Sequence, residues 1–121
     1  MTPFGLRLRE LREQRNLTQR EMAAAIGVSP AYLSALEHGK RGQPSWALLQ
    51  RIVGYFNIIW DDAEQLQNLA AISDPKVTID TSDLSAPATE LANLLADRIG
   101  ELDGDEIGAL LEFLKSDSQR S

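Results

Sequence analysis

The chain of 121 residues is long enough for one small domain, with or without a short appendage, and its 43% of hydrophobic residues can supply a core. It contains no cysteine, which excludes disulfides and thiolate metal sites, and it has no long apolar run at the N-terminus, so we expect neither a signal peptide nor a membrane span. A reducing cytoplasm fits this composition, whereas a net charge of −6 argues, over the whole chain, against binding to nucleic acid.

The first predicted helix runs from Pro3 to Arg15, with Thr2 as its N-cap. Asn16 follows it and is a residue type that accepts the left-handed backbone with which many helices end. The apolar side chains that recur at helical spacing are Phe4, Leu8 and Leu11.

Residues 18–39 (TQREMAAAIGVSPAYLSALEHG) contain two short helical patterns that meet at Gly27. The first opens with a capping box of Thr18 and Glu21, and the second opens with Ser29 as N-cap before Pro30. Gly27 allows the left-handed backbone that ends the first helix. The pattern predicts a helix-turn-helix, and the alternative is a tight helical pair that serves packing alone.

Two more helices are predicted after the loop GKRGQP (39–44). One begins near Ser45, and the other runs from Trp60 or Asp61 to Ile72. Their expected inward faces are Leu49, Ile52, Val53 and Phe56 in the first, and Ala63, Leu66, Leu69 and Ala70 in the second.

The composition changes after residue 72. Residues 73–87 (SDPKVTIDTSDLSAP) are rich in turn formers and are expected to be a linker. Within it, KVTID alternates Val77 and Ile79 with polar residues, which predicts a short strand that is not stable alone.

Two amphipathic helices are predicted over residues 88–115, and residues 116–121 are expected to be a disordered tail. The first helix covers residues 88–99, and the second opens with a capping box of Asp103 and Glu106. The two helices cannot bury their apolar stripes alone, so they either dock on residues 1–72 or pair with a second copy, in which KVTID of two chains pairs across a two-fold axis. The residues of that dimerisation hypothesis are Val77, Ile79, Leu91, Leu94, Leu95, Ile107, Leu110, Leu111 and Leu114.

The segments LRELREQRNLTQ (8–19) and VSPAYLSALEHGKRGQPS (28–45), with Ala23 and Gly27 between them, resemble the lambda repressor and Cro family of XRE-type helix-turn-helix regulators. The resemblance implies an all-α chain in which residues 1–72 form a five-helix DNA-binding domain. It also implies a buried ion pair between Arg12 and Glu37 that ties the first helix to the third.

Charge is distributed unevenly along the chain. Residues 1–55 hold eight Lys and Arg against four Glu, a net charge of +4, whereas residues 56–121 hold four basic and fourteen acidic residues, a net charge of −10. The motif lies in the basic half, so the overall acidity does not argue against DNA binding.

By the resemblance, the first part of the second motif helix enters the major groove, and the start of the first motif helix contacts phosphate. The reading helix is poor in Arg, Asn and Gln, so Ser34 is its polar candidate for a base edge. Lys40 and Arg41, just past the helix, are the foremost candidates for polar readers or for phosphate clamps. Tyr32 contacts a base, contacts a phosphate or packs, and Trp46 contacts the DNA backbone or belongs to the core. The expected DNA-binding residues are Gln19, Arg20, Ser29, Pro30, Ala31, Tyr32, Ser34, Lys40, Arg41, Gln43 and Trp46.

No residue pattern indicates catalysis, a metal or a cofactor. His38 is the single histidine, and it fits a residue at a helix C-terminus better than a metal ligand. The carboxylates of residues 61–62 and 103–106 stand at helix starts, where they complement the dipole. Gly100 and Gly104 lack the spacing and the lysine of a phosphate loop. We expect a protein that is not an enzyme.

These features predict a cytoplasmic, nucleoid-associated transcriptional regulator that binds double-stranded DNA. We expect a repressor that binds a pseudo-palindromic operator as a homodimer, with the second motif helix in the major groove. The rival hypothesis is an antitoxin-like interaction module whose acidic C-terminal part binds a partner protein.

Overall fold

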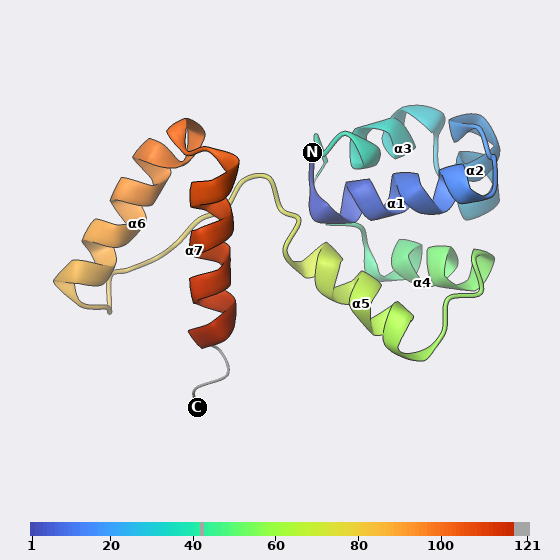
Figure 1. Cartoon of the computed structure of the whole chain (residues 1–121). Helices are drawn as coiled ribbons and strands as arrows, with labels where there is room; N and C mark the ends of the chain where they lie inside the picture. The colour runs from blue at the N-terminus through green and yellow to red at the C-terminus, as the bar shows by residue number, and fades with distance from the viewer. Residues whose placement is uncertain (42, 118–121) are drawn as a thin grey trace. The chain divides into compact units, whose positions relative to one another are not determined.

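The computed structural model describes residues 1–41 and 43–117, and within these ranges its regular elements are helices (Figure 1). Contacts divide the chain into an N-terminal unit, Met1–Val77, and a C-terminal unit, Thr78–Ser121. Every described helix is too short or too polar to pass through a bilayer. The helices are α1 (Pro3–Gln14), α2 (Gln19–Ile26), α3 (Pro30–Glu37), α4 (Trp46–Tyr55), α5 (Trp60–Ala71), α6 (Ala86–Arg98), the 3₁₀ turn η1 (Ile99–Glu101) and α7 (Gly104–Asp117).

Side-chain caps fix where the helices of the N-terminal unit begin. Thr2, Ser29 and Ser45 each accept a backbone N–H from three residues further on. At α2 the capping box is complete, since Thr18 Oγ1 accepts the Glu21 N–H at 3.1 Å and the Glu21 carboxylate accepts the Thr18 N–H at 2.9 Å. The bond from the Thr18 backbone holds the pKa of Glu21 below its usual value.

Left-handed residues end the first two helices, as the sequence predicts. Asn16 has φ 55° directly after the last turn of α1, and Gly27 has φ 76° as the C-cap of α2. Two residues, Val28 and Ser29, then separate Gly27 from α3, so α2 and α3 meet through a short turn.

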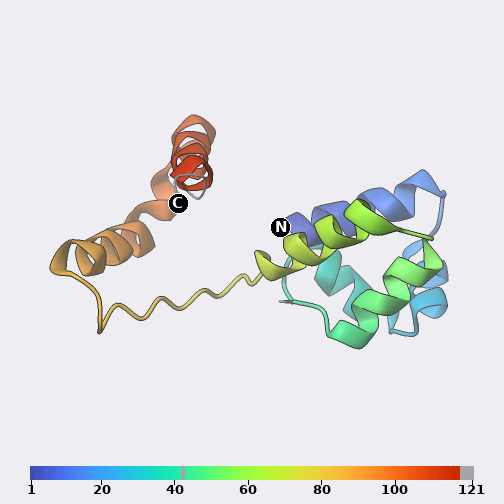
Figure 2. The same ribbon diagram turned by 90° about the horizontal axis from the view of Figure 1, so that it is seen from below.

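One apolar core lies among α1–α5, which Figure 2 shows from below. Val53, Leu69 and Ala63, which were expected to point inward, are only half-buried, whereas Leu48 is buried without having been predicted. The buried apolar residues are Phe4, Leu8, Leu11, Met22, Ala23, Ile26, Leu33, Leu36, Leu48, Leu49, Ile52, Phe56, Leu66 and Ala70.

Gly5 allows α1 to approach the end of α3 closely. A Cβ atom placed on Gly5 would lie 2.4 Å from the Leu36 carbonyl oxygen and 2.9 Å from that of Glu37. Both distances are shorter than van der Waals contact and both partners are backbone atoms, so only glycine fits at this crossing.

Ser73 closes the N-terminal unit and is not part of a linker. Its side chain is buried, its Oγ accepts the Phe4 N–H at 2.9 Å, and its hydroxyl donates to the Leu69 carbonyl. The packing of the N-terminal unit therefore extends past residue 72, where the sequence predicts its end. A contact between residues 69 positions apart leaves no local signal in the sequence.

The predicted strand at KVTID is wrong: residues 76–80 have no strand partner within the described chain and run as irregular backbone (Figure 2). The Asp74 carboxylate accepts the Lys76 N–H at 3.0 Å, and the Asp80 carboxylate accepts the Ser82 N–H at 2.9 Å. The Ser82 hydroxyl also donates to Asp80, which lowers the pKa of that carboxyl. These turns leave too few extended residues for a ladder.

The C-terminal unit consists of α6, η1 and α7. Ser85 caps α6, which begins at Ala86 and so starts inside the predicted linker, because Pro87 is tolerated in a first turn. At α7 Asp103 and Glu106 form the predicted reciprocal cap. Of the predicted tail, residues 116 and 117 belong to α7, and residues 118–121 lie outside the described residues.

We predict that Gly5→Ala lowers the free energy of unfolding by about 1–3 kcal/mol, because the new methyl group overlaps two carbonyl oxygens of α3. Gly54→Ala is the control, since a Cβ there meets nothing within 4 Å and a helical alanine is favoured by about 0.5–1 kcal/mol. Urea titration of both variants measures the two effects. Equal stabilities for the variants would contradict the proposed close approach.

Candidate nucleic-acid interface

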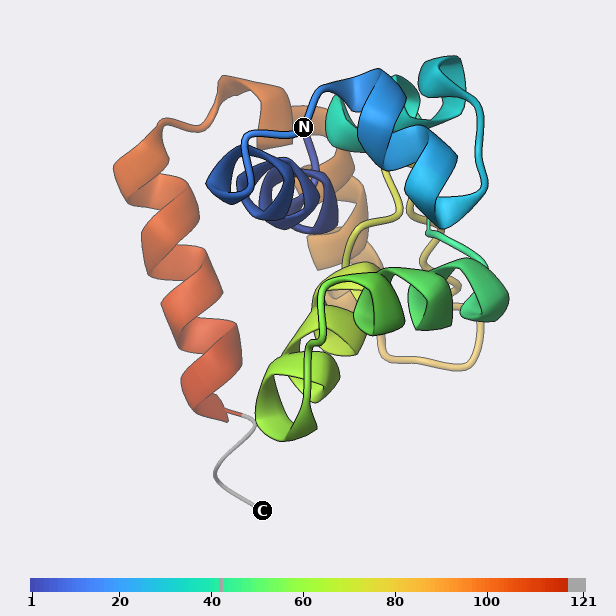
Figure 3. The same cartoon turned by 90° about the vertical axis from the view of Figure 1, so that its right-hand side faces the viewer.

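Helices α2 and α3 lie next to each other in the N-terminal unit (Figure 3), and the residues that the sequence analysis assigns to DNA lie on these two helices, on the loop after α3 and at the start of α4. At the start of α2, Arg20 is exposed, and at the start of α3, Ser29, Pro30 and Ala31 are exposed. The opposite face of α3 carries Leu33 and Leu36 into the core. The core thus orients α3 so that its first turn faces solvent.

Arg12 and Glu37 form a bidentate ion pair between α1 and α3. Arg12 Nε lies 2.8 Å from Glu37 Oε2, and Nη2 lies 3.1 Å from Oε1. The Glu37 side chain is 1% exposed and that of Arg12 is 16% exposed. The hydrogen bond to Glu37 raises the pKa of Arg12, which favours the charged guanidinium.

The same carboxylate also holds the start of α2. Gln19 Nε2 donates to Glu37 Oε1 at 3.3 Å, and Arg12 Nη1 donates to the Leu17 carbonyl at 2.9 Å. Gln19 is half-buried by this arrangement, whereas the neighbouring Arg20 remains exposed. Gln19 therefore has a positioning role in the free protein, in addition to the phosphate contact expected for it.

The outward side of α3 borders a hollow of about 400 Å³, lined by Ala31, Ser34, Ala35, His38 and Lys40. Ser34 is half-buried there, with its Oγ 3.4 Å from His38 Nδ1. His38 Nδ1 also lies 2.8 Å from the Ser34 carbonyl oxygen. The imidazole therefore caps the end of α3, where the sequence analysis expects it, and it also borders this surface, which the sequence alone does not indicate.

Tyr32 and Arg41 form a stacked pair at the edge of this surface. The Arg41 guanidinium lies 5.6 Å from the centroid of the Tyr32 ring, and the ring packs partly against the core. Of the three interpretations of Tyr32, packing is the one for which the structure supplies contacts. Arg41 is exposed and is held near α3 by this ring.

Gln43 and Trp46 lie between the end of α3 and the first turn of α4. Gln43 Nε2 donates to the Ala71 carbonyl at 2.9 Å, so its amide holds the end of α5. Trp46 is 66% exposed, which removes the interpretation of this residue as part of the core. Both residues border a hollow of about 260 Å³ together with Pro44, Leu49, Gln67, Ala70 and Ala71.

The family model described as "Helix-turn-helix domain" matches residues 3–66, which cover α1–α4 and the first half of α5. The chain belongs to this family. The match confirms the resemblance to XRE-type helix-turn-helix regulators, and it agrees with the expectation that the protein is not an enzyme.

Two curated relatives from Bacillus subtilis (strain 168) each match about half of the chain. One is named "Uncharacterized HTH-type transcriptional regulator RghRB" and is 39% identical over 62 residues, which cover 51% of this chain and 45% of the relative. The other is named "HTH-type transcriptional repressor RghR" and is 41% identical over 61 residues, which cover 50% of this chain and 45% of the relative. The matched segment thus spans less than half the length of these relatives.

A solved structure titled "SINR PROTEIN/SINI PROTEIN COMPLEX" covers 97% of this chain and 99% of its own, at 18% identity and a TM-score of 0.46. A likeness this weak says nothing about whether this chain assembles with another protein.

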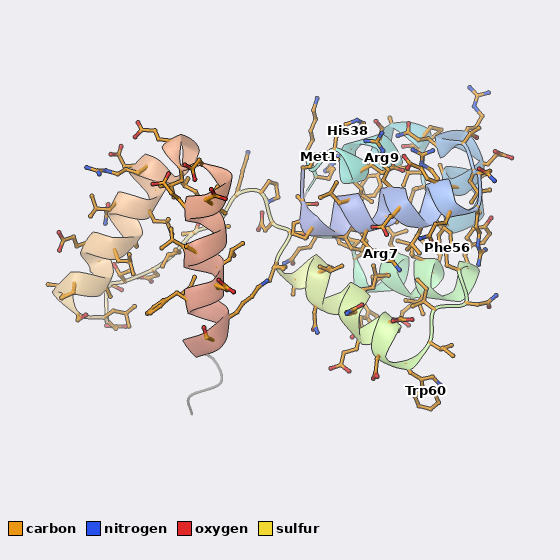
Figure 4. All side chains as sticks on the ribbon, in the orientation of Figure 1. Met1, Arg7, Arg9, His38, Phe56 and Trp60 are labelled. Atoms are coloured by element: carbon orange, nitrogen blue, oxygen red, sulfur yellow. The ribbon has the colours of Figure 1, made fainter. Side chains whose placement is uncertain are left out.

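We predict that Arg12→Ala lowers the free energy of unfolding by about 3–5 kcal/mol, because it leaves the Glu37 carboxylate buried and unpaired. Arg7→Ala is the control, since Arg7 is paired with Glu10 on the exposed surface of α1 (Figure 4), and such pairs contribute about 1 kcal/mol or less. Replacing both partners, as Arg12→Met with Glu37→Leu, should recover much of the loss. Thermal and urea unfolding of the four proteins measures this, and equal small effects of the two alanine variants would contradict it.

Proposed function

We propose that the protein is a DNA-binding transcriptional regulator, and specifically a repressor that binds a pseudo-palindromic operator with α3 in the major groove. Its family and the name of the relative RghR support the coarse function. The docking, the symmetry and the sign of regulation are our inference from the geometry of the N-terminal unit.

The distribution of unpaired positive charge carries this proposal. On α1, Arg7, Arg9 and Arg12 each pair with a carboxylate. By contrast, Arg20 at the start of α2 and Lys40 after α3 are exposed and have no ion pair or hydrogen bond from their side chains within the described residues. Cations that the fold leaves unneutralised beside a reading helix favour contact with phosphates.

The start of α2 and the outward side of α3 are expected to have different roles in binding DNA. Arg20 lies at the N-terminus of α2, where the dipole also favours an anion, so it positions the protein without reading bases. Ser34 borders the outward hollow of α3, where base edges are expected.

We predict that Arg20→Ala weakens binding to operator and random duplexes alike and lowers the salt slope by about one unit, because one phosphate contact is lost. Ser34→Ala should leave the random duplex unaffected and cost on the order of 1 kcal/mol on the operator. The measurement is a titration of both variants on both duplexes at two salt concentrations, with the operator obtained by selection from a random pool.

An equal loss on both duplexes for Ser34→Ala would mean that α3 docks differently. Failure of the wild-type chain to bind any duplex at low salt would contradict the proposed function itself.

We also propose that the C-terminal unit forms the homodimer contact. Its apolar side chains are exposed on α6 and α7: Leu91 is 66% exposed, Leu111 is 49% exposed and Leu114 is 63% exposed. Leu95 is half-buried, and the other large apolar residues on these helices, Leu94, Ile107, Leu110 and Phe113, are exposed as well. Apolar stripes of this extent favour burial against an equivalent surface of a second copy.

We predict that Leu111→Glu in the full chain converts a dimer into a monomer, because it places a charge in the apolar stripe of α7. Ala109→Glu is the control, since residue 109 lies on the opposite side of the same helix and is also exposed. Light scattering measures both masses. A dimer that survives Leu111→Glu would exclude the α7 stripe as the interface.

The alternative is an antitoxin-like module in which the same acidic, apolar unit binds a different protein. The exposed apolar stripes of α6 and α7 are as suitable for binding a different protein as they are for binding a second copy. A wild-type chain that is monomeric in the light-scattering experiment would select this alternative over the homodimer.

A further inference from the structure

A hollow of about 330 Å³ lies beside the first turn of α3, on the side that faces α4. Its described lining contains one guanidinium, three hydroxyls and no carboxylate, so its polar side chains can all donate hydrogen bonds to an anion. The lining residues are Val28, Ser29, Tyr32, Ser45, Leu48 and Arg51.

Arg51 lies next to the turn of the helix-turn-helix. A Cβ atom placed on Gly27 would be 3.8 Å from Arg51 Nε and 3.9 Å from its Cζ, so the guanidinium rests against the chain between α2 and α3. The side chain reaches this point from the second turn of α4, and the residue is exposed.

The charge of Arg51 is not compensated. Within the described residues its side chain has no ion pair, hydrogen bond or aromatic contact. The contrast with Arg15 is clear, since Arg15 donates to the Tyr55 and Phe56 carbonyls and lies 4.8 Å from the centroid of the Phe56 ring. The fold uses Arg15 for packing and leaves Arg51 available.

The two serines add donors to the hollow. Ser29 Oγ accepts the Tyr32 N–H at 3.1 Å, and Ser45 Oγ accepts the Leu48 N–H at 3.1 Å. Each hydroxyl keeps its own proton, which it can donate to an anionic oxygen. The donors of the hollow therefore suit the oxygens of an anion with a single negative charge.

We propose that this hollow binds a phosphodiester group of the DNA backbone, with Arg51 as its cation. The proposal rests on the proposed function, because a duplex that receives α3 in its major groove brings its own phosphates to the start of that helix. The site is open, and one guanidinium binds a free phosphate ion weakly, which favours the tethered phosphate of a duplex over a small ligand.

Titrations of Arg51→Gln and Arg7→Gln test this assignment. Both variants remove one positive charge from the N-terminal unit, but Arg7 is already paired with Glu10 on α1. The probes are a random-sequence duplex and a duplex selected by the wild-type chain, each at several salt concentrations. Arg51→Gln should reduce the magnitude of the slope of log K against log salt by about 0.9 on both duplexes. Arg7→Gln should leave the slope unchanged. Arg51→Lys, which keeps the positive charge, should have a slope close to that of the wild type.

An unchanged slope for Arg51→Gln, with wild-type binding intact, would overturn this inference and leave the proposed function standing. The hollow would instead be assigned to a small phosphate ligand by two results together. Inorganic phosphate would raise the melting temperature of the wild type but not that of Arg51→Gln, and the salt slope of DNA binding would be unchanged in that variant. Absence of wild-type binding to either duplex would overturn both proposals.

Discussion

The carboxylate of Glu37 is the group on which the geometry of the N-terminal unit depends. It is buried at the end of α3, and it accepts hydrogen bonds from Arg12 on α1 and from Gln19 at the start of α2. A buried carboxylate without partners costs several kcal/mol, so the three helices are stable together only in an arrangement that keeps these donors in place. Because Gln19 begins α2 and Glu37 ends α3, the network fixes the distance between the two ends of the proposed DNA surface.

This network requires the close crossing of α1 and α3. Gly5 and Arg12 are seven residues apart, which places them on the same face of α1, and both meet the last turn of α3. The missing side chain of Gly5 lets the backbones approach, and the long side chain of Arg12 then reaches the carboxylate. Ser73 completes the arrangement by bonding the Phe4 N–H at the start of α1. Packing and polar contacts along α1 therefore support the motif from behind the proposed DNA surface.

The parts of the fold that the sequence predicts are those set by local chemistry. The caps at Thr18 and Ser29 and the left-handed residues Asn16 and Gly27 act within a few positions, and the structure has all four. The strand at residues 76–80 failed because alternation of side chains does not supply a partner strand. Ser73 was placed in the linker because its partner, Phe4, is far along the chain, and for the same reason the sequence does not predict the bond between Gln43 and Ala71. For the candidate site the limit is similar: residue type identifies the arginines, but only the folded contacts separate Arg15, which is bonded to the Tyr55 and Phe56 carbonyls, from the available Arg51.

The acidic C-terminal unit imposes an electrostatic condition on the proposed assembly. Residues 78–117 hold ten acidic residues against two basic ones, so two copies that meet through α6 and α7 repel each other at long range. Apolar burial along the stripes has to exceed this repulsion, and salt helps because it screens charges beyond about 10 Å at 0.1 M. The proposed contacts of Arg20 and Arg51 with phosphate have the opposite dependence, since salt competes with them. In the proposed dimer, rising salt therefore strengthens the contact between the two copies while it weakens the contact of each copy with DNA. Because the two effects oppose each other, the affinity for the operator falls less steeply with salt than the number of phosphate contacts alone predicts.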